Sequence, residues 1–225
     1  IASGVELESI VISSRKSGSI SSLVPGGVQV YVLSDREIER LVGFKFHRGC
    51  LAIGERPAPL AIGKLLGGVS FHNPLIVAER INDADNVGSI FRNASAFGAA
   101  AVVLSRGCCD PLYRKALRTS MGACLQVPFT MLDDWPGDLQ ILRQFGYHLV
   151  ALTPDRKASP LERFIIPTET RGVALLLGSE GDGLSESVLA WGDSSLRINI
   201  ETAVDSLNVA TASAVALYHL RGLMH

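Results

Sequence analysis

The sequence predicts an α/β protein built around a mainly parallel sheet that helices cover on both faces. Apolar runs alternate with amphipathic segments from about residue 71 onward, and "PLIVAE" (74–79) and "GVALLLG" (172–178) are apolar nearly throughout. Strands of this kind are buried on both sides, which is typical of parallel sheets between two helix layers. Hydrophobic residues make up 47% of the 225 positions, enough for a packed core.

The same periodicities predict the elements of a larger domain, which we assign to residues 71–225. Gly98 is expected to end its first helix, and Pro111 to lie in the first turn of its second. The predicted strands are 74–79, 99–105, 147–153, 172–178 and 196–200, and the predicted helices are 86–98, 111–122 and 206–222.

Residues 1–56 predict a separate small α/β module, and 57–70 a linker that contains two prolines and three glycines. In the module, Ser34 and Glu37 have the spacing of a capping box and Gly43 is a stop signal, so 34–43 is predicted as a helix. The predicted strands of the module are 7–13, 28–33 and 49–54.

The formal net charge of −1 excludes a strongly basic nucleic-acid binder, so any polyanion site must come from a local patch. No apolar run reaches the roughly 18 residues of a membrane span, and no signal peptide is visible. The cysteines lack zinc-site spacing, and we expect reduced thiols, no metal and a cytoplasmic protein. These cysteines are Cys50, Cys108, Cys109 and Cys124.

A glycine-rich loop, "LLLGSEGDGLSE" (175–186), follows a buried strand and precedes a helix start at Ser185. In open α/β sheets, ligands bind at the carboxyl ends of strands, so the loop is a candidate site. Its G-x-x-G-x-G order is not the dinucleotide fingerprint, and it lacks the Lys-Ser/Thr of a P-loop. Its acidic residues also suit phosphate poorly. On its own, a structural tight turn explains the loop equally well.

Two other segments carry polar residues at strand–helix junctions. In 79–99, Asn86 and Gly88 begin a helix, a Gly88 amide is expected to face a ligand, and Arg92 shares the face of Gly88. The alternative for Arg92 is a surface ion pair with Asp85 or Glu79. In 198–212, Ser206 or Asp205 is expected to cap the final helix, which would leave the first amides of that helix free to bind a ligand. The alternative is that these residues only cap the helix.

Together the segments resemble the three motifs of the SPOUT superfamily of methyltransferases, specifically the TrmH-type RNA ribose 2′-O-methyltransferases. The resemblance covers residues 71 to 225. Its first motif is matched by Asn86, Gly88, Arg92 and "AFG" (96–98), its second by "LLLGSEGDGLS" (175–185), and its third by "INIETAVDSLNVATASAVALYHL" (198–220). The stretch "RTSMGA" (118–123) resembles the family's segment between motifs one and two.

The resemblance implies a deep trefoil knot whose loops bind S-adenosylmethionine. This cofactor carries a positively charged sulfonium group, which the acidic glycine-rich loop does not repel. It implies a homodimer with the site at the interface, and methyl transfer to a ribose 2′-hydroxyl of rRNA or tRNA. Arg92 is the family's proposed base, although a charge clamp suits a guanidinium better. The implied cofactor residues are Thr153, Leu177, Gly178, Gly183, Ile198 and Leu207, and the implied catalytic residues are Asn86, Arg92, Glu180, Ser206 and Asn208.

RNA would need further contacts, and the segment 106–118 offers a candidate patch of Arg106, Arg114, Lys115 and Arg118 against the single acid Asp110. A solvated helix face is the alternative. The stretch "HRGCLAIG" (47–54) resembles the end of the ribosomal-protein-like RNA-binding module that precedes many family members.

Three other functions stay open from the sequence. A catalytically inactive RNA-binding or ribosome-assembly protein would keep the fold, but would not need Arg92, Glu180, Ser206 and Asn208 together. Methylation of a base is disfavoured by Arg92 and the "SLN" of motif three. A flavodoxin-like nucleotide carrier would bind phosphate groups and not S-adenosylmethionine.

Overall fold

A computed structural model describes residues 4–46, 49–201, 203 and 205–224. The chain forms two compact units, Ile1–Ala58 and Pro59–His225. The division falls two residues after the end that we predicted for the small module. The second part of the predicted linker forms a helix, α3 (Ile62–Gly67), whose Leu65 and Leu66 are buried in the larger unit.

The small unit contains a mixed sheet in which β1 (Leu7–Ser13) pairs with β2 (Gln29–Leu33) in parallel and with β3 (Cys50–Gly54) antiparallel. The short helix α1 (Ser17–Ile20) follows β1, and α2 (Asp35–Val42) follows β2. The predicted capping box is confirmed, because Glu37 N–H donates to the Ser34 side chain and the Glu37 carboxylate accepts from Ser34 N–H. Gly43 ends α2 with φ 75°.

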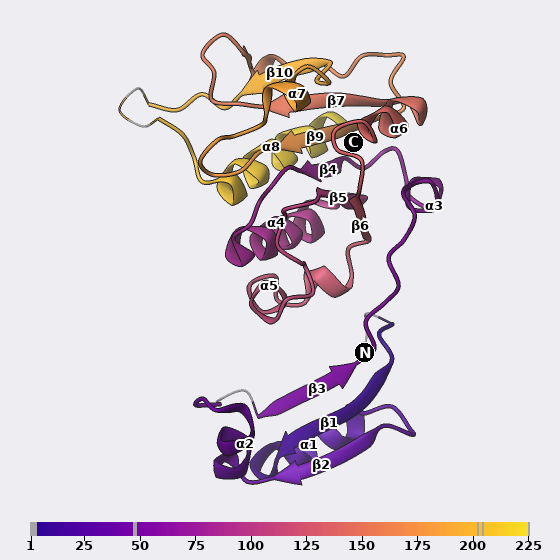
Figure 1. Ribbon diagram of the computed structural model, residues 1–225, viewed down its shortest axis with the longest axis vertical. Coiled ribbons are helices and arrows are strands. Elements are labelled where there is room, and N and C mark those ends of the chain that lie inside the picture. The colour runs from indigo at the N-terminus through magenta and orange to yellow at the C-terminus, as the bar shows by residue number, and fades with distance from the viewer. Residues whose placement is uncertain (1–3, 47–48, 202, 204, 225) are drawn as a thin grey trace. The chain divides into compact units, whose positions relative to one another are not determined.

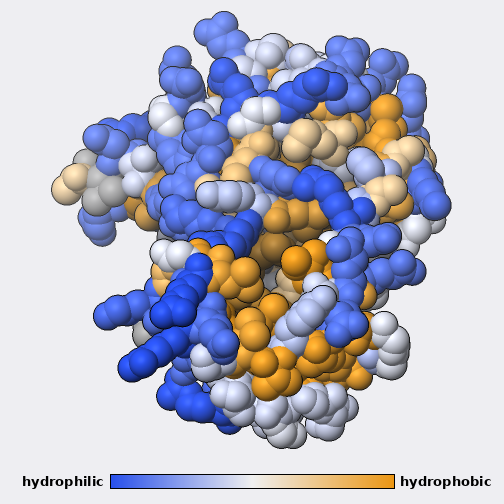
Figure 2. Space-filling view, turned by 60° about the horizontal axis from the view of Figure 1, so that its bottom comes forward, coloured by the Kyte–Doolittle hydropathy of each residue, from blue (hydrophilic) through white to orange (hydrophobic). Residues whose placement is uncertain are grey.

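Few side chains of the small unit are fully buried. Several of its large apolar side chains are instead exposed, and Figure 2 shows hydrophobic residues at the surface among hydrophilic ones. The buried apolar side chains of this unit are Ile10, Ile12, Ile38 and Phe46, and the large exposed ones are Leu23, Tyr31, Val32, Leu41, Phe44 and Ile53. His47 and Arg48, which begin the "HRGCLAIG" stretch, lie outside the described residues.

The larger unit is organised around a parallel sheet, as predicted. Among the described residues its strand order is β6-β5-β4-β9-β7-β10-β8, and all paired neighbours run parallel. The strands are β4 (Leu75–Ala78), β5 (Ala101–Ser105), β6 (Phe129–Leu132), β7 (Tyr147–Leu152), β8 (Ser159–Pro160), β9 (Gly172–Leu177) and β10 (Ser194–Arg197). Because β4 lies beside β9, the first motif and the glycine loop leave the sheet at adjacent positions (Figure 1).

Two apolar clusters cover the two faces of this sheet. Alternate residues of one strand belong to different clusters: Ile76 lies in the cluster with α4 (Ala84–Phe97) and α8 (Val209–Met224), and Val77 lies in the other. The second cluster includes residues of α3 and of α6 (Leu139–Gln144) and α7 (Glu186–Leu189). Short 3-10 helices occur at Ser14–Lys16, Ser21–Leu23, Ala123–Leu125 and Leu161–Arg163.

Some predicted boundaries were wrong. The helix predicted at 111–122 is α5 (Arg114–Thr119), and Pro111 precedes it, because Asp110 accepts hydrogen bonds from Leu112 N–H and Tyr113 N–H (both 2.9 Å) in a turn. The strand predicted at 196–200 is β10, which begins two residues earlier. β6 and α6 were not predicted. No helix in the described parts of the chain is long and apolar enough to span a membrane.

Candidate active site

The glycine-rich loop closes on itself. Ser179 N–H donates to Gly183 O (3.2 Å), and Gly183 N–H donates to Ser179 O (3.1 Å). A side chain on Gly178 would place its Cβ 2.1 Å from the Gly183 carbonyl carbon, so the close approach at Gly178 is made by the loop itself. Gly183 has φ 68°, a left-handed conformation that favours glycine.

A buried carboxylate anchors the far end of this loop. Glu79 is 2% exposed, at the end of β4. It accepts hydrogen bonds from Ser185 N–H (2.7 Å), the Ser185 hydroxyl (2.8 Å) and Trp135 Nε1–H (2.9 Å). Sequence reasoning considered Glu79 only as a partner of Arg92, and it missed this anchoring contact. Ser185 caps α7 as predicted, accepting from Val188 N–H (3.3 Å).

A chain of side-chain hydrogen bonds joins the three motif segments. The Asn86 amide donates to Glu180 Oε1, and Asn208 Nδ2 donates to Asn86 Oδ1 (2.9 Å). Asn208 Oδ1 also accepts from Ala210 N–H (2.9 Å) and Thr211 N–H (3.3 Å). Asn208 therefore caps α8, which corrects the expectation that Ser206 or Asp205 does so.

Residues expected around a cofactor line one cavity of about 620 Å³, a volume typical of small-molecule sites. It is bordered by Thr153, Leu177, Gly178, Gly183, Ile198 and Leu207, together with Glu180 and Ser206. Its charged lining consists of Glu180, Asp182, Glu201, Asp205, Arg156 and Arg197, an excess of acids. A Cβ added at Gly181 or Gly183 would meet no atom within 4 Å, so both leave bare backbone facing open space.

Arg92 lies exposed on α4, and it makes none of the ion pairs that the sequence suggested. Asp85 instead pairs with Lys115 Nζ (2.9 Å) and accepts from the Thr119 hydroxyl (2.8 Å). Gly88 has a packing role, because its added Cβ would lie 2.6 Å from Ala116 O of α5. Contact with α5, rather than an approaching ligand, accounts for this glycine.

The predicted RNA patch is partly neutralised by acids from distant segments. Arg106 pairs with Asp133, with Nε at 2.9 Å from its carboxylate, and Lys115 pairs with Asp85. Hydrogen bonding to Asp85 raises the pKa of Lys115, and Lys115 lowers the pKa of Asp85. Arg114 and Arg118 lie on the same helix, α5.

Burial disfavours the thiolate form of the four cysteines by raising the pKa of each thiol. Cys50, Cys108, Cys109 and Cys124 are all free thiols. Burial raises the pKa of Cys124 to about 11, and burial also raises the pKa of Cys108. No group of three or more metal-ligating side chains occurs within the described ranges.

The sheet and its loop-bounded cavity define the molecule as an α/β protein with a small-ligand site at the carboxyl edge of parallel strands. The chain belongs to the SpoU rRNA Methylase family, whose profile matches residues 73–218.

Two curated relatives illustrate this membership. An uncharacterized tRNA/rRNA methyltransferase of Mycobacterium tuberculosis is 41% identical over 192 residues, covering 85% of this chain and 66% of that protein. The chain thus spans just under two thirds of the length of that relative. The 23S rRNA (guanosine-2′-O-)-methyltransferase RlmB of Acinetobacter baylyi is 29% identical over 198 residues, covering 86% of this chain and 78% of that protein.

Solved structures share the fold over nearly the whole chain. A TrmH-family protein from Porphyromonas gingivalis matches with a TM-score of 0.81 and 26% identity, covering 97% of this chain and 84% of that one. The SpoU methyltransferase AviRb from Streptomyces viridochromogenes, in complex with AdoMet, matches with a TM-score of 0.82 and 22% identity, covering 98% and 84%.

Proposed function

We propose that this protein transfers the methyl group of S-adenosylmethionine to a ribose 2′-hydroxyl of rRNA or tRNA. The observation that carries the proposal is the hydrogen-bonded chain Glu180–Asn86–Asn208, which joins three segments far apart in the sequence. Glu180 of this chain also lines the cavity of about 620 Å³. Family membership supports the same reaction class.

The cavity lining fits this cofactor. When bound, S-adenosylmethionine supplies an electrophilic methyl group on a positively charged sulfur. The acidic excess of the lining favours a cation, and the bare backbone at Gly181 and Gly183 leaves room for a flat ring. Thr153, Leu177, Gly178, Gly183, Ile198 and Leu207 would hold the cofactor, largely through backbone and apolar contacts.

Arg92 acts on the RNA in this proposal. A guanidinium holds its proton tightly, so a role as general base is disfavoured. Arg92 instead stabilises negative charge on the ribose oxygen or an adjoining phosphate. Asn86 and Asn208 orient polar groups, Glu180 fixes Asn86, and Ser206 adds a hydroxyl at the cavity. Positioning of the reacting atoms then dominates the rate.

We further infer a cytoplasmic homodimer and a trefoil knot formed by the segments around the cavity. A dimer is supported by apolar side chains that α8 exposes: Val215, Tyr218, which is 71% exposed, and Leu223. Tyr218 packs edge-on against Phe97 of α4, so the two helices share an apolar surface. The knot is supported by membership of a family that resembles the knotted SPOUT superfamily.

Calorimetry with S-adenosylmethionine, followed by incubation with tritiated cofactor and total cellular RNA, tests the proposal. Wild type should bind the cofactor and produce alkali-resistant 2′-O-methyl nucleotides. Leu207→Trp should abolish binding by filling the cavity. Arg92→Ala should keep cofactor binding within about twofold while lowering methyl transfer by about 100-fold, the loss typical of one charge-stabilising donor.

Two results would contradict the proposal. A folded protein that binds RNA but no cofactor would be the non-catalytic assembly protein. Label recovered in a base rather than a ribose would place the methyl group elsewhere on the nucleotide.

A further inference from the structure

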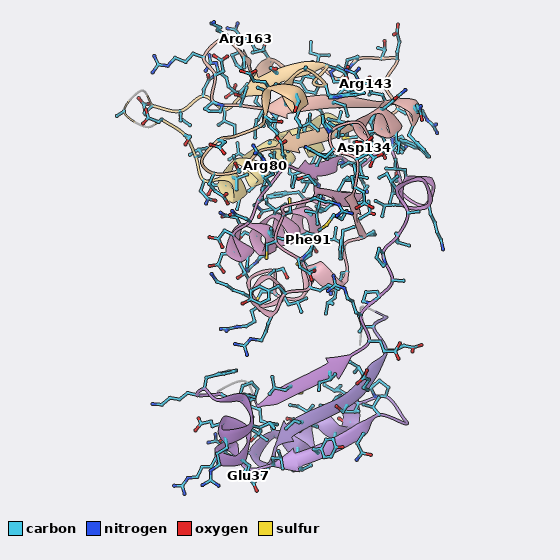
Figure 3. All side chains as sticks on the ribbon, in the orientation of Figure 1. Glu37, Arg80, Phe91, Asp134, Arg143 and Arg163 are labelled. Atoms are coloured by element: carbon cyan, nitrogen blue, oxygen red, sulfur yellow. The ribbon has the colours of Figure 1, made fainter. Side chains whose placement is uncertain are left out.

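A second pocket, of about 680 Å³, lies where β8 pairs with β10. We call it the basic pocket, and it is lined by Arg156, Lys157, Ala158, Ser159, Pro160, Glu162, Arg163, Arg197 and Asn199. Four of these side chains are cationic and one is a carboxylate. Figure 3 shows Arg163 beyond β10, at the margin of the large unit.

The backbone around the basic pocket is ordered by its own hydrogen bonds. Asp155 N–H donates to the Thr153 hydroxyl (3.2 Å), and Lys157 N–H donates to Asp155 Oδ1 (2.9 Å). This turn sets Arg156 and Lys157 in exposed positions. Thr153 belongs to the cofactor cavity, so the same turn leads from one pocket to the other.

One cation of the pocket is fixed and three are available. Arg197 is half-buried, and it donates from Nε to Ala158 O (3.1 Å) and from a terminal nitrogen to Asn199 Oδ1. Arg156, Lys157 and Arg163 are exposed, and no carboxylate of the described residues lies within 4 Å of their charged nitrogens. They differ in this from Arg106 and Lys115, whose charges are neutralised.

We propose that the basic pocket binds the phosphodiester backbone of the RNA substrate; this inference rests on the proposed function. A lining with four cations and one carboxylate selects an anion, and several unpaired cations suit a chain of phosphates. Contacts to phosphate fix the register of RNA without reading its sequence. Arg156 and Arg197 line both pockets, so a backbone held here lies beside the cofactor cavity and positions the nucleotide to be methylated.

Fluorescence anisotropy of the full chain with fluorescein-labelled 20-nucleotide oligouridylate, titrated over a range of KCl concentrations, tests this site. Lys157→Ala/Arg163→Ala should weaken binding about tenfold and lower the salt slope by about 1.4, since each phosphate contact on a single strand contributes about 0.7. The matched control Arg106→Ala/Lys115→Ala removes two cations that are already ion-paired, and should change affinity less than about twofold. The charge-preserving Lys157→Arg/Arg163→Lys should bind like wild type.

Calorimetry with S-adenosylmethionine on the same proteins separates this inference from the proposed function. The double alanine variant should bind the cofactor as wild type does, which also shows that it is folded. If wild type binds cofactor and labels RNA while the alanine variant keeps the wild-type affinity and salt slope, only the basic pocket is overturned. Wild type that binds no oligouridylate overturns it as well. Wild type that neither binds cofactor nor labels RNA overturns the proposed function itself.

Discussion

The two compact units differ in how they are stabilised. The small unit fully buries only a few of its described apolar side chains and exposes others such as Tyr31 and Ile53. The large unit packs two clusters against opposite faces of its sheet, and it contains all the residues of the proposed site. Small domains bury a smaller fraction of their surface and are only marginally stable. The comparison teaches that cofactor binding should depend on the large unit alone.

The largest expected effect is a loss of affinity for S-adenosylmethionine when a side chain is added at Gly178, where backbone contacts in the large unit are tightest. Gly178→Ala would force a Cβ to within 2.1 Å of Gly183. Overpacking of this kind costs up to about 3 kcal/mol, and a distortion of that size in the cavity wall would lower the affinity for S-adenosylmethionine by about 100-fold. Gly63→Ala in α3 is the matched control, because its Cβ would meet nothing within 4 Å and Gly63 lies outside the cavity lining. Calorimetry measures both affinities. Equal affinities for the two variants would contradict the claim that the close backbone approach at Gly178 shapes the cofactor cavity.

A core truncation in the small unit tests the independence of the units. Ile12 is fully buried in β1, and Ile12→Ala should cost about 3 kcal/mol of the free energy of unfolding. Because few other buried side chains support that sheet, we expect it to unfold at lower urea than the large unit. Circular dichroism and cofactor calorimetry on the same samples check this. Loss of cofactor affinity in Ile12→Ala would break the comparison.

Two carboxylates sharpen the contrast between the units. Glu79→Gln in the large unit removes an acceptor for Ser185 at a buried position, and should cost about 2 kcal/mol, the range for hydrogen bonds to charged groups. Glu37→Gln in the small unit lies in an exposed capping box that also accommodates glutamine, so no measurable change in the unfolding midpoint is expected. Urea denaturation measures both, and similar losses would contradict the contrast.

The smallest expected effect is a dependence of stability on pH, which arises from His148 in the large unit. Burial lowers the pKa of His148, although Asp193 opposes and Arg143 adds to this shift. The unfolded chain then binds the proton more readily, so His148 contributes stability above its unfolded pKa of about 6.5 and loses it as the pH falls through that value. The urea midpoint should therefore drop more for wild type than for His148→Gln between pH 7.5 and 5.5. Parallel curves for the two proteins would contradict this.

Local signals predicted the fold well where one segment determines its own structure. The capping box of Ser34 and Glu37 and the stop at Gly98 occur as the sequence indicated. The helix predicted from Pro111 begins later, because the Asp110 turn competes with the helix for the first amides. β6 is only four residues long, so it spans too few positions to show the period of a strand.

The features of the site that the sequence could not predict depend on contacts between segments far apart in the chain. The cluster of cations at 106–118 is visible in the sequence, but its neutralising partners Asp133 and Asp85 come from other segments. The cations of the basic pocket are brought together by the pairing of β8 with β10, with Arg197 beside Pro160. The convergence of the motifs themselves was suggested by resemblance, and Asn86 bonded to Glu180 and Asn208 shows them together.

The strand order has a consequence for the order of events during synthesis. β1 finds both partners within the first unit, so every strand of that sheet is available once Cys50–Gly54 has left the ribosome. In the large unit Leu75 of β4 pairs with Ala174 of β9, and the centre of the sheet stays open until most of the chain has emerged. Contacts between distant segments form slowly, and unpaired strand edges invite aggregation in the meantime. We therefore expect the nascent large unit to be the part of this chain most exposed to aggregation.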